Sequence, residues 1–186
     1  MDFTQAKQTV LSELQGVFDT VDEKQVVELT EMICSAEKVF VVGVGSVLLM
    51  LQAFTKRLNH LGIEANFVGA IDEPAITDKD LLIVGSGSGE SAVPVAIVKI
   101  AKKYNAKIAH IGSNANSSMT PYEDLFVRIP CSTKLDLPDE IKSNQVMSSL
   151  FEQSLLLLGD MIALLIVDKE GITDLHSLWR KHANLE

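Results

Sequence analysis

Short apolar runs alternate, along the middle of the chain, with longer segments in which apolar residues recur every three or four positions. Five short runs have the length and the β-branched character of buried strands: 38–42, 65–69, 81–84, 107–111 and 125–129. Strands that alternate with helical segments form right-handed βαβ units and share one parallel sheet. For five such strands the commonest order is 2-1-3-4-5. The pattern therefore predicts an α/β fold, a three-layer α/β/α sandwich with helices on both faces of the sheet.

Helical spacing also marks both ends of the chain. Two amphipathic helices precede the first strand, with Asp22 as the N-cap of the second. After an irregular connection over residues 132–143, a long helix opens at Gln145, and a short helix follows from Thr173. We expect a single domain over residues 1–186, made of N-terminal helices (3–35), a sheet core (38–130) and C-terminal helices (143–182).

The long C-terminal helix is apolar on nearly every side from Leu155 to Val167. It is not expected to span a membrane, because Glu152 and Asp160 would each cost about 2.5–3.5 kcal/mol at a bilayer centre. A helix this apolar has more surface to bury than the core of one subunit requires. We therefore expect a homodimer or homotetramer.

Composition narrows the choice of ligand and location. The formal net charge of −9 argues against binding nucleic acid or an anionic membrane surface, so an anionic ligand must be held by local dipoles. Cys34 and Cys131 have no CxxC partner, which indicates neither a disulfide framework nor a zinc site. The first residues lack the basic start and apolar core of a signal peptide. We expect a cytoplasmic protein that binds no metal.

A glycine-rich loop follows the third predicted strand and precedes a helix, in the sequence Gly85-Ser-Gly-Ser-Gly-Glu-Ser91. Its glycines allow backbone N–H groups to converge on an anion at the positive end of the helix. The hydroxyls of Ser86, Ser88 and Ser91 can donate to phosphate oxygens. The loop fits neither the Walker pattern nor the dinucleotide pattern GxGxxG. A flexible turn is the alternative, and the position between strand and helix favours an anion site.

A second loop of the same kind, Gly43-Val-Gly45-Ser46, follows the first predicted strand. In a sheet of order 2-1-3-4-5, ligands bind beyond the carboxyl ends of strands one and three, where the strand order reverses. Both glycine loops are therefore expected to face one crevice. A third polar loop, residues 114–118, either lines its rim or is simply solvated.

Several motifs together resemble the SIS (sugar isomerase) domain family, and within it the 6-phospho-3-hexuloisomerase branch. They span nearly the whole chain: Val-Val-Gly43-Val-Gly45, Arg57-Leu-Asn-His60-Leu-Gly62, Ser86-Gly-Ser-Gly-Glu-Ser91, Met147-Ser-Ser-Leu-Phe-Glu152-Gln and His182-Ala-Asn-Leu-Glu186. The resemblance implies a flavodoxin-like SIS fold and the interconversion of a 3-hexulose 6-phosphate with fructose 6-phosphate. It implies an enediolate intermediate, no cofactor, and sites at subunit interfaces.

The resemblance also assigns residues. Glu152 matches the family's proposed base, and the phosphate and substrate would be bound by Gly45, Ser46, Ser86, Gly87, Ser88, Gly89, Glu90 and Ser91. Proton abstraction beside a carbonyl needs a positioned base, which suits Glu152. The alternative is that Glu152 stabilises a helix N-terminus or forms an interface salt bridge.

His60 raises a geometric question. It lies about fourteen residues beyond Ser46 on the same predicted helix, roughly 20 Å at 1.5 Å per residue, so it cannot reach its own crevice. The resemblance implies that a neighbouring subunit donates it. The alternative is a histidine favoured by the negative C-terminal end of the helix, just before Gly62.

The glycine loop that begins at Gly43 departs from the family pattern Gly-x-Gly-Arg-Ser-Gly. Ser46 stands at the Arg position and Val47 at the Ser position, so both side-chain donors are altered. Two hypotheses remain open at this point. The protein is an isomerase of a sugar phosphate, or it is a phosphosugar sensor that acts through a partner protein.

Overall fold

The computed structural model describes residues 1–185, and its centre is a sheet of five parallel strands in the order β2-β1-β3-β4-β5. The predicted order is confirmed, and Val41 on β1 pairs with Phe67 on one side and Ile83 on the other. The strands are β1 (Val39–Val42), β2 (Ala65–Phe67), β3 (Leu81–Gly85), β4 (Lys107–Gly112) and β5 (Leu125–Arg128).

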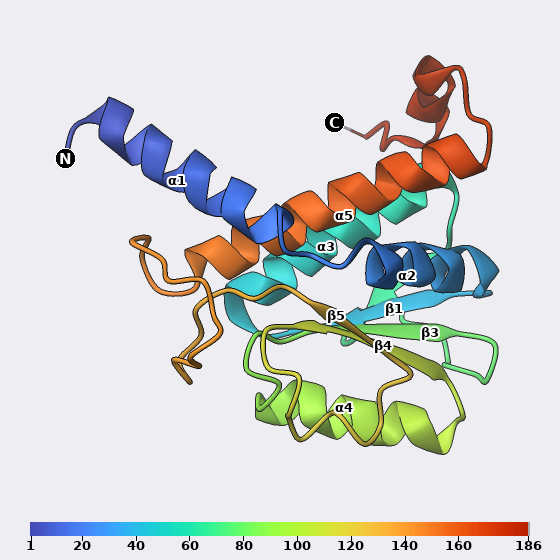
Figure 1. Ribbon diagram of the computed structural model, residues 1–186. Helices are drawn as coiled ribbons and strands as arrows, with labels where there is room; N and C mark the ends of the chain where they lie inside the picture. The colour runs from blue at the N-terminus through green and yellow to red at the C-terminus, as the bar shows by residue number, and fades with distance from the viewer. Residues whose placement is uncertain (186) are drawn as a thin grey trace.

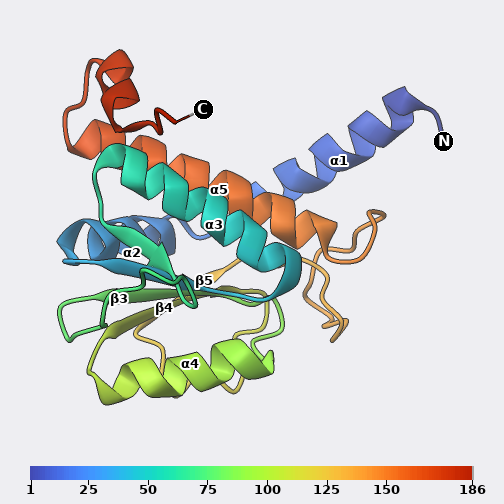
Figure 2. The ribbon, with the colours of Figure 1, turned by 180° about the vertical axis from the view of Figure 1, so that it is seen from behind.

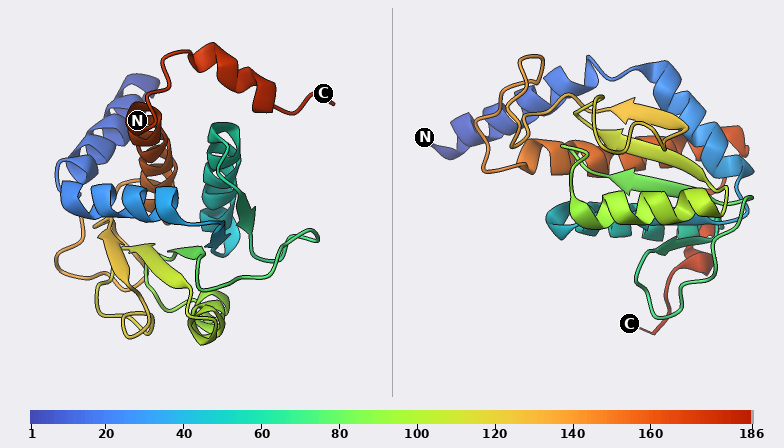
Figure 3. Two further views of the ribbon diagram at one scale, coloured as in Figure 1. Left: turned by 90° about the vertical axis from the view of Figure 1, so that its right-hand side faces the viewer. Right: turned by 90° about the horizontal axis from the view of Figure 1, so that it is seen from below.

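Helices cover both faces of the sheet, which confirms the three-layer sandwich, but the layers are unequal. Among the described residues, α4 is the one helix on one face, whereas the opposite face carries α2, α3 and α5, with α1 packed on α5 (Figure 1; Figure 3, right). The helices are α1 (Phe3–Phe18), α2 (Glu23–Ser35), α3 (Gly45–Leu61), α4 (Ala92–Lys103) and α5 (Ser149–Lys169), and a 3-10 helix, η1, spans Leu175–Lys181.

Successive strand residues point into two separate cores. On β1, Phe40 and Val42 pack toward Val98 of α4, whereas Val39 and Val41 pack toward the helices of the opposite face. Strands buried on both faces have no polar side to show, which explains why the sequence contains continuous apolar runs rather than alternation.

The long helix α5 lies beside α3 on the more heavily covered face (Figure 2). It is long and apolar enough to cross a membrane by length and composition, but half of its apolar stretch is buried within this fold, as in a core helix. The two helices approach closely at Gly159, where an added Cβ would lie 2.8 Å from Cδ2 of Phe54. Four apolar side chains of α5 remain substantially exposed: Leu157, Met161, Leu164 and Leu165.

The predicted start of this helix at Gln145 is wrong, because α5 begins at Ser149. Met147 has a left-handed φ of +54°, which a helix does not permit. The preceding segment is held instead against α1, where the Glu13 carboxylate accepts hydrogen bonds from Ser143 Oγ at 2.6 Å and from Gln145 Nε2 at 3.0 Å. This tertiary contact overrides the helical spacing of the polar residues.

The close approach at Gly159 leads to a stability prediction. Gly159→Ala should lower the free energy of unfolding by about 1–3 kcal/mol, because the methyl group overpacks against the buried Phe54 ring. Gly16→Ala adds the same methyl group to α1, where nothing lies within 4 Å, and should raise stability by about 0.5–1 kcal/mol. Urea unfolding measures both changes, and equal effects would show that α3 and α5 do not meet closely here.

Candidate active site

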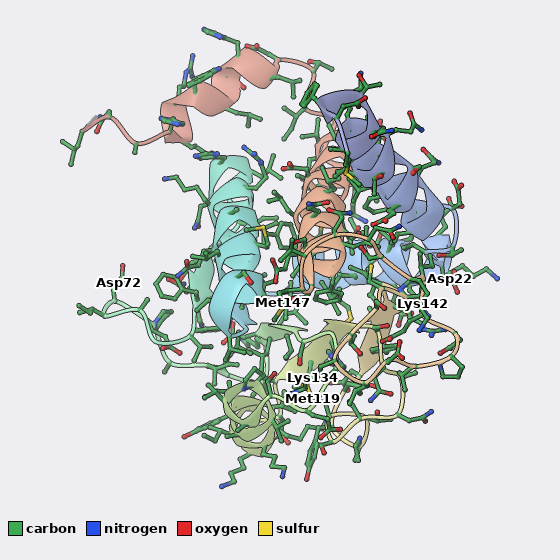
Figure 4. All side chains as sticks on the ribbon, turned by 90° about the vertical axis from the view of Figure 1, so that its left-hand side faces the viewer. Asp22, Asp72, Met119, Lys134, Lys142 and Met147 are labelled. Atoms are coloured by element: carbon green, nitrogen blue, oxygen red, sulfur yellow. The ribbon has the colours of Figure 1, made fainter. Side chains whose placement is uncertain are left out.

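A pocket of about 550 Å³ opens beyond the carboxyl ends of β1 and β3. Figure 4 looks onto this edge, with Met147 and Lys134 in the middle of the view and Lys142 to one side. The pocket is lined by both glycine loops, the β5–α5 connection and the start of α5: Val44, Gly85, Ser86, Gly87, Ser88, Ser91, Ser132, Thr133, Lys134, Ser143, Met147, Ser148 and Phe151. It therefore lies where the strand order predicts a ligand.

The glycine loop after β3, residues 85–91, turns its backbone donors toward this pocket. The Gly87 carbonyl accepts hydrogen bonds from the N–H groups of Ser113 at 2.9 Å and Asn114 at 3.1 Å, on the β4 side of the loop. In a planar trans peptide, C=O and N–H point in opposite directions, so the Ser88 N–H points toward the pocket. Within residues 1–185, the N–H groups of Gly87 and Ser88 have no acceptor. Two such donors form an anion-binding concavity.

Residues 114–118, for which the sequence left open a place at the rim or a solvated loop, are not among the residues that line the pocket. They support the glycine loop from behind, since Asn114 Nδ2 donates to the Ser88 carbonyl at 3.1 Å. Glu90, predicted to bind the substrate, is also engaged on the side of residues 114–118. Its carboxylate accepts hydrogen bonds from the N–H and Oγ of Ser118 at 2.8 and 2.6 Å. These bonds lower the pKa of Glu90. Gly89, with φ +68°, provides the turn between the pocket residues and Glu90.

The glycine loop after β1 places Ser46 against Glu152. Helix α3 begins at Gly45, whose φ is +58°, and the next residue donates from Ser46 Oγ to Glu152 Oε1 at 2.5 Å. Ser148 Oγ, which belongs to the pocket lining, donates to the same oxygen at 2.7 Å. The half-buried carboxylate of Glu152 is therefore fixed at the side of the pocket by two hydroxyls.

Lys134, which no sequence motif indicated, is the one positively charged residue among the described residues that line the pocket. Its loop is organised by the buried carboxylate of Glu140, which accepts hydrogen bonds from the N–H groups of Thr133 at 3.0 Å and Leu137 at 2.9 Å. Ser113 Oγ donates to the other Glu140 oxygen at 3.0 Å. The irregular connection after β5 gave no periodic signal from which its return to the pocket could be predicted.

His60 lies apart from this pocket, at the opposite end of α3 from Ser46. Its ring stacks on His182 with centroids 5.2 Å apart, in a second and mainly apolar hollow of about 500 Å³ that Trp179 and Leu164 also line. Burial is the main cause that lowers the pKa of His60, and the positive charges around the ring lower it further. The ring is therefore neutral near pH 7. The final residue of the closing motif, Glu186, lies outside the described residues.

Comparisons with known proteins agree with this architecture. The chain matches the family model of the SIS domain over residues 32–157. It is 35% identical over 186 residues, the whole of both chains, to a 3-hexulose-6-phosphate isomerase of Bacillus subtilis. A 3-hexulose-6-phosphate isomerase of Mycobacterium gastri is 35% identical over 185 residues, covering 100% of this chain and 92% of the relative.

A solved structure is also similar over its full length. It is a hypothetical protein of Methanococcus jannaschii for which a molecular function of 3-hexulose-6-phosphate isomerase is inferred. It matches with a TM-score of 0.82 and 27% identity, covering 98% of this chain and 99% of that chain.

The pocket's single cation generates a binding prediction. Lys134→Gln should weaken sulfate binding roughly three- to tenfold, the scale of one partly exposed charge contact, and the effect should shrink as salt increases. NMR shifts of the Gly87 and Ser88 amides report occupancy of the pocket. Lys142→Gln is the matched control, because Lys142 pairs with Asp136 on the same connection and does not line the pocket. Equal losses in both variants would mean that only the general surface charge matters.

Proposed function

We propose that this chain, which belongs to the SIS domain family, isomerises a sugar phosphate, namely a 3-hexulose 6-phosphate to and from fructose 6-phosphate. The observation that carries the proposal is the carboxylate of Glu152, held by Ser46 and Ser148 beside an anion-binding pocket. Full-length similarity to relatives named 3-hexulose-6-phosphate isomerase supports the same substrate.

The chemistry follows from the two kinds of group in the site. The phosphate binds at the Gly87 and Ser88 N–H groups, with the loop hydroxyls and Lys134 supplying further donors. Glu152 removes the proton from C2, next to the C3 carbonyl, and an enediolate forms. Returning that proton to C3, while the hydroxyl proton moves from O2 to O3, gives the 2-ketose. Electrons move only within the substrate, so the isomerisation requires no oxidant or reductant.

Ser46 takes on a specific role in this scheme. The hydroxyl that replaces the family's arginine donates to Glu152, so it orients the base instead of adding a charge beside the phosphate. Lys134 supplies a positive charge from another part of the pocket lining. The departure at Ser46 and Val47 is therefore compatible with an isomerase, whereas it was the main ground for considering a sensor.

The proposed assembly is a homodimer or homotetramer whose subunits share active sites. Support comes from the hollow around His60, where Trp179 is 65% exposed and Leu164 is 66% exposed in the single chain. His60 Nε2 is buried without a hydrogen-bond partner in the described chain. We infer that His60 serves the pocket of a neighbouring subunit, where its neutral ring assists proton transfer or handling of the sugar ring.

We also propose a cytoplasmic location, as expected for an enzyme of phosphorylated sugars. Both cysteines are free thiols, and burial raises the pKa of Cys131 to about 12, so that this thiol stays protonated and unreactive.

The first catalytic prediction concerns the base. Glu152→Gln should lower kcat at least about a hundredfold and leave binding of fructose 6-phosphate within a few fold, because the amide keeps the shape but cannot take a proton. Exchange of deuterium from solvent into the substrate, followed by NMR, measures the proton transfer directly. Asp168→Asn, on the exposed side of the same helix, is the control and should leave exchange unchanged.

Two results would contradict the proposal. Undiminished exchange in Glu152→Gln would remove this residue from the mechanism. Binding of fructose 6-phosphate by the unaltered protein, without exchange in it or in other ketose and aldose phosphates, would favour the sensor.

A second prediction tests whether His60 acts between subunits. His60→Asn and Glu152→Gln variants should each be inactive alone, and mixing them after gentle dissociation should restore activity. In a randomly mixed dimer about a quarter of the sites would combine an intact Glu152 with an intact partner histidine. Co-purification of one untagged variant with the other, affinity-tagged variant confirms that subunits exchange. Mixed dimers that form but stay inactive would show that His60 does not act across the interface.

A further inference from the structure

Among the described residues of α1, Glu13 is the one whose side chain forms hydrogen bonds with the segment that enters α5. Its Oε2 accepts from Ser143 Oγ at 2.6 Å and from Gln145 Nε2 at 3.0 Å. Its Oε1 accepts from the N–H of Asn144 at 2.8 Å and from Asn144 Nδ2 at 3.2 Å. Burial disfavours the ionised form, but these hydrogen bonds together outweigh it and lower the pKa of Glu13. An ionised carboxylate only accepts hydrogen bonds, so it suits these donors.

The segment that Glu13 holds, residues 143–148, has little apolar packing of its own. Val146 and Met147 are 78% and 90% exposed. The left-handed φ of Met147 keeps the segment out of the regular hydrogen bonds of α5. A hollow of about 290 Å³ lies between α1 and part of the segment, so the two are not closely packed there. The position of the segment therefore depends on its hydrogen bonds.

The start of α5 provides further hydrogen bonds to the same segment. Gln153 Nε2 donates to Gln145 Oε1 at 2.8 Å, and the N–H of Ser149 donates to the carbonyl of Val146 at 3.1 Å. These bonds connect the segment to the helix that follows it. Glu13 instead connects the segment to a helix more than a hundred residues away, and so fixes it relative to the body of the protein.

The last residue of the segment contacts the proposed base. Ser148 Oγ donates to Glu152 Oε1 at 2.7 Å, and Ser46 Oγ donates to the same oxygen from α3 at 2.5 Å. Two donors from different elements restrict the rotation of the carboxylate. Among the described residues, no donor engages Glu152 Oε2, which leaves this oxygen to take the substrate proton. Displacing Ser148 would remove one of the two donors and leave Ser46.

We propose that Glu13 is a positioning residue for catalysis, because it holds residues 143–148 where Ser148 orients the carboxylate of Glu152. Helix α1 then belongs to the active site without touching the substrate. The inference rests on the proposed isomerase for the role of the base. The phosphate loop is held separately, by residues that follow β4, so Glu13 affects proton transfer and not the binding of the anion.

The test compares proton transfer with anion binding. Glu13→Ala should lower kcat roughly tenfold, because misplacing a catalytic group by about 1 Å costs on the order of a hundredfold and Ser46 retains part of the orientation. Sulfate affinity, followed by the NMR shift of the Gly87 amide, should stay within about twofold. Asp19→Ala is the matched control and should change neither quantity, because Asp19 accepts from Gln15 within α1. A fall in sulfate affinity as large as the fall in kcat would overturn the proposal.

Conservative variants separate geometry from charge and from folding. Glu13→Gln keeps the length of the side chain and an oxygen that accepts from Asn144, so it should retain most of kcat. Glu13→Asp keeps the charge but is one methylene shorter, so it should lower kcat nearly as much as Glu13→Ala. Urea unfolding shows which variants are folded under the assay conditions. Full activity in a folded Glu13→Asp variant would contradict the positioning role.

A double-mutant cycle tests whether Glu13 acts through Ser148. Ser148→Ala alone should lower kcat roughly tenfold, because it removes the same donor to Glu152. Adding Glu13→Ala, or Glu13→Asp, to this variant should then lower kcat by less than about a further twofold. An equal effect of the Glu13 substitution with and without Ser148 would refute the proposal.

A readout without turnover distinguishes failure of this inference from failure of the proposed function. In the protein without substrate, the NMR signal of the Glu152 carboxyl carbon should move in Glu13→Ala and in Ser148→Ala, and should stay in place in Asp19→Ala. This response in a protein that exchanges no substrate proton would leave the positioning role intact and remove the isomerase activity. Proton exchange at an unchanged rate in Glu13→Ala would remove the positioning role and leave the isomerase.

Discussion

The carbonyl oxygens of the glycine loop need donors on the side away from the pocket, and the rest of the site depends on how this need is met. The Gly87 carbonyl is held by backbone N–H groups after β4, and the Ser88 carbonyl by the side chain of Asn114. The Ser86 carbonyl accepts a hydrogen bond from the Gly89 N–H at 3.2 Å and faces the ring of His110. With these oxygens held from behind, the N–H groups of Gly87 and Ser88 are available to an anion without rearrangement, and preorganised donors bind at little cost.

Local dipoles and one cation allow this acidic protein to bind an anion. A formal net charge of −9 opposes the approach of a sugar phosphate, so the site must supply its own positive potential. The backbone N–H groups supply positive potential at one wall of the pocket. Lys134 supplies a positive charge from a loop that the buried Glu140 holds in place. The carboxylate of Glu152 stands apart from both, engaged by two hydroxyls, where it can remain an effective base.

The sequence predicted the sheet and the position of the pocket because both follow from local patterns. Buried strands are continuous apolar runs, and glycine loops after strands one and three converge wherever the order reverses. It failed where a distant contact decides the outcome. The start of α5 depends on Glu13, more than a hundred residues away. The return of Lys134 to the pocket depends on Glu140 in the same irregular connection, which has no periodic pattern from which a contact could be predicted.

Helix α3 imposes a final constraint on how the site can be completed. A straight helix separates Ser46 from His60 by about 20 Å, and packing along α5 prevents it from bending to bring the two ends together. The same helix can nevertheless serve two pockets if its N-terminal end contributes to one and its C-terminal end to that of another subunit. In the single chain the end that bears His60 is surrounded by exposed apolar groups, and its Nε2 lacks a partner. Association would cover these groups and bring His60 to a second pocket in one step, which would make catalysis inseparable from assembly.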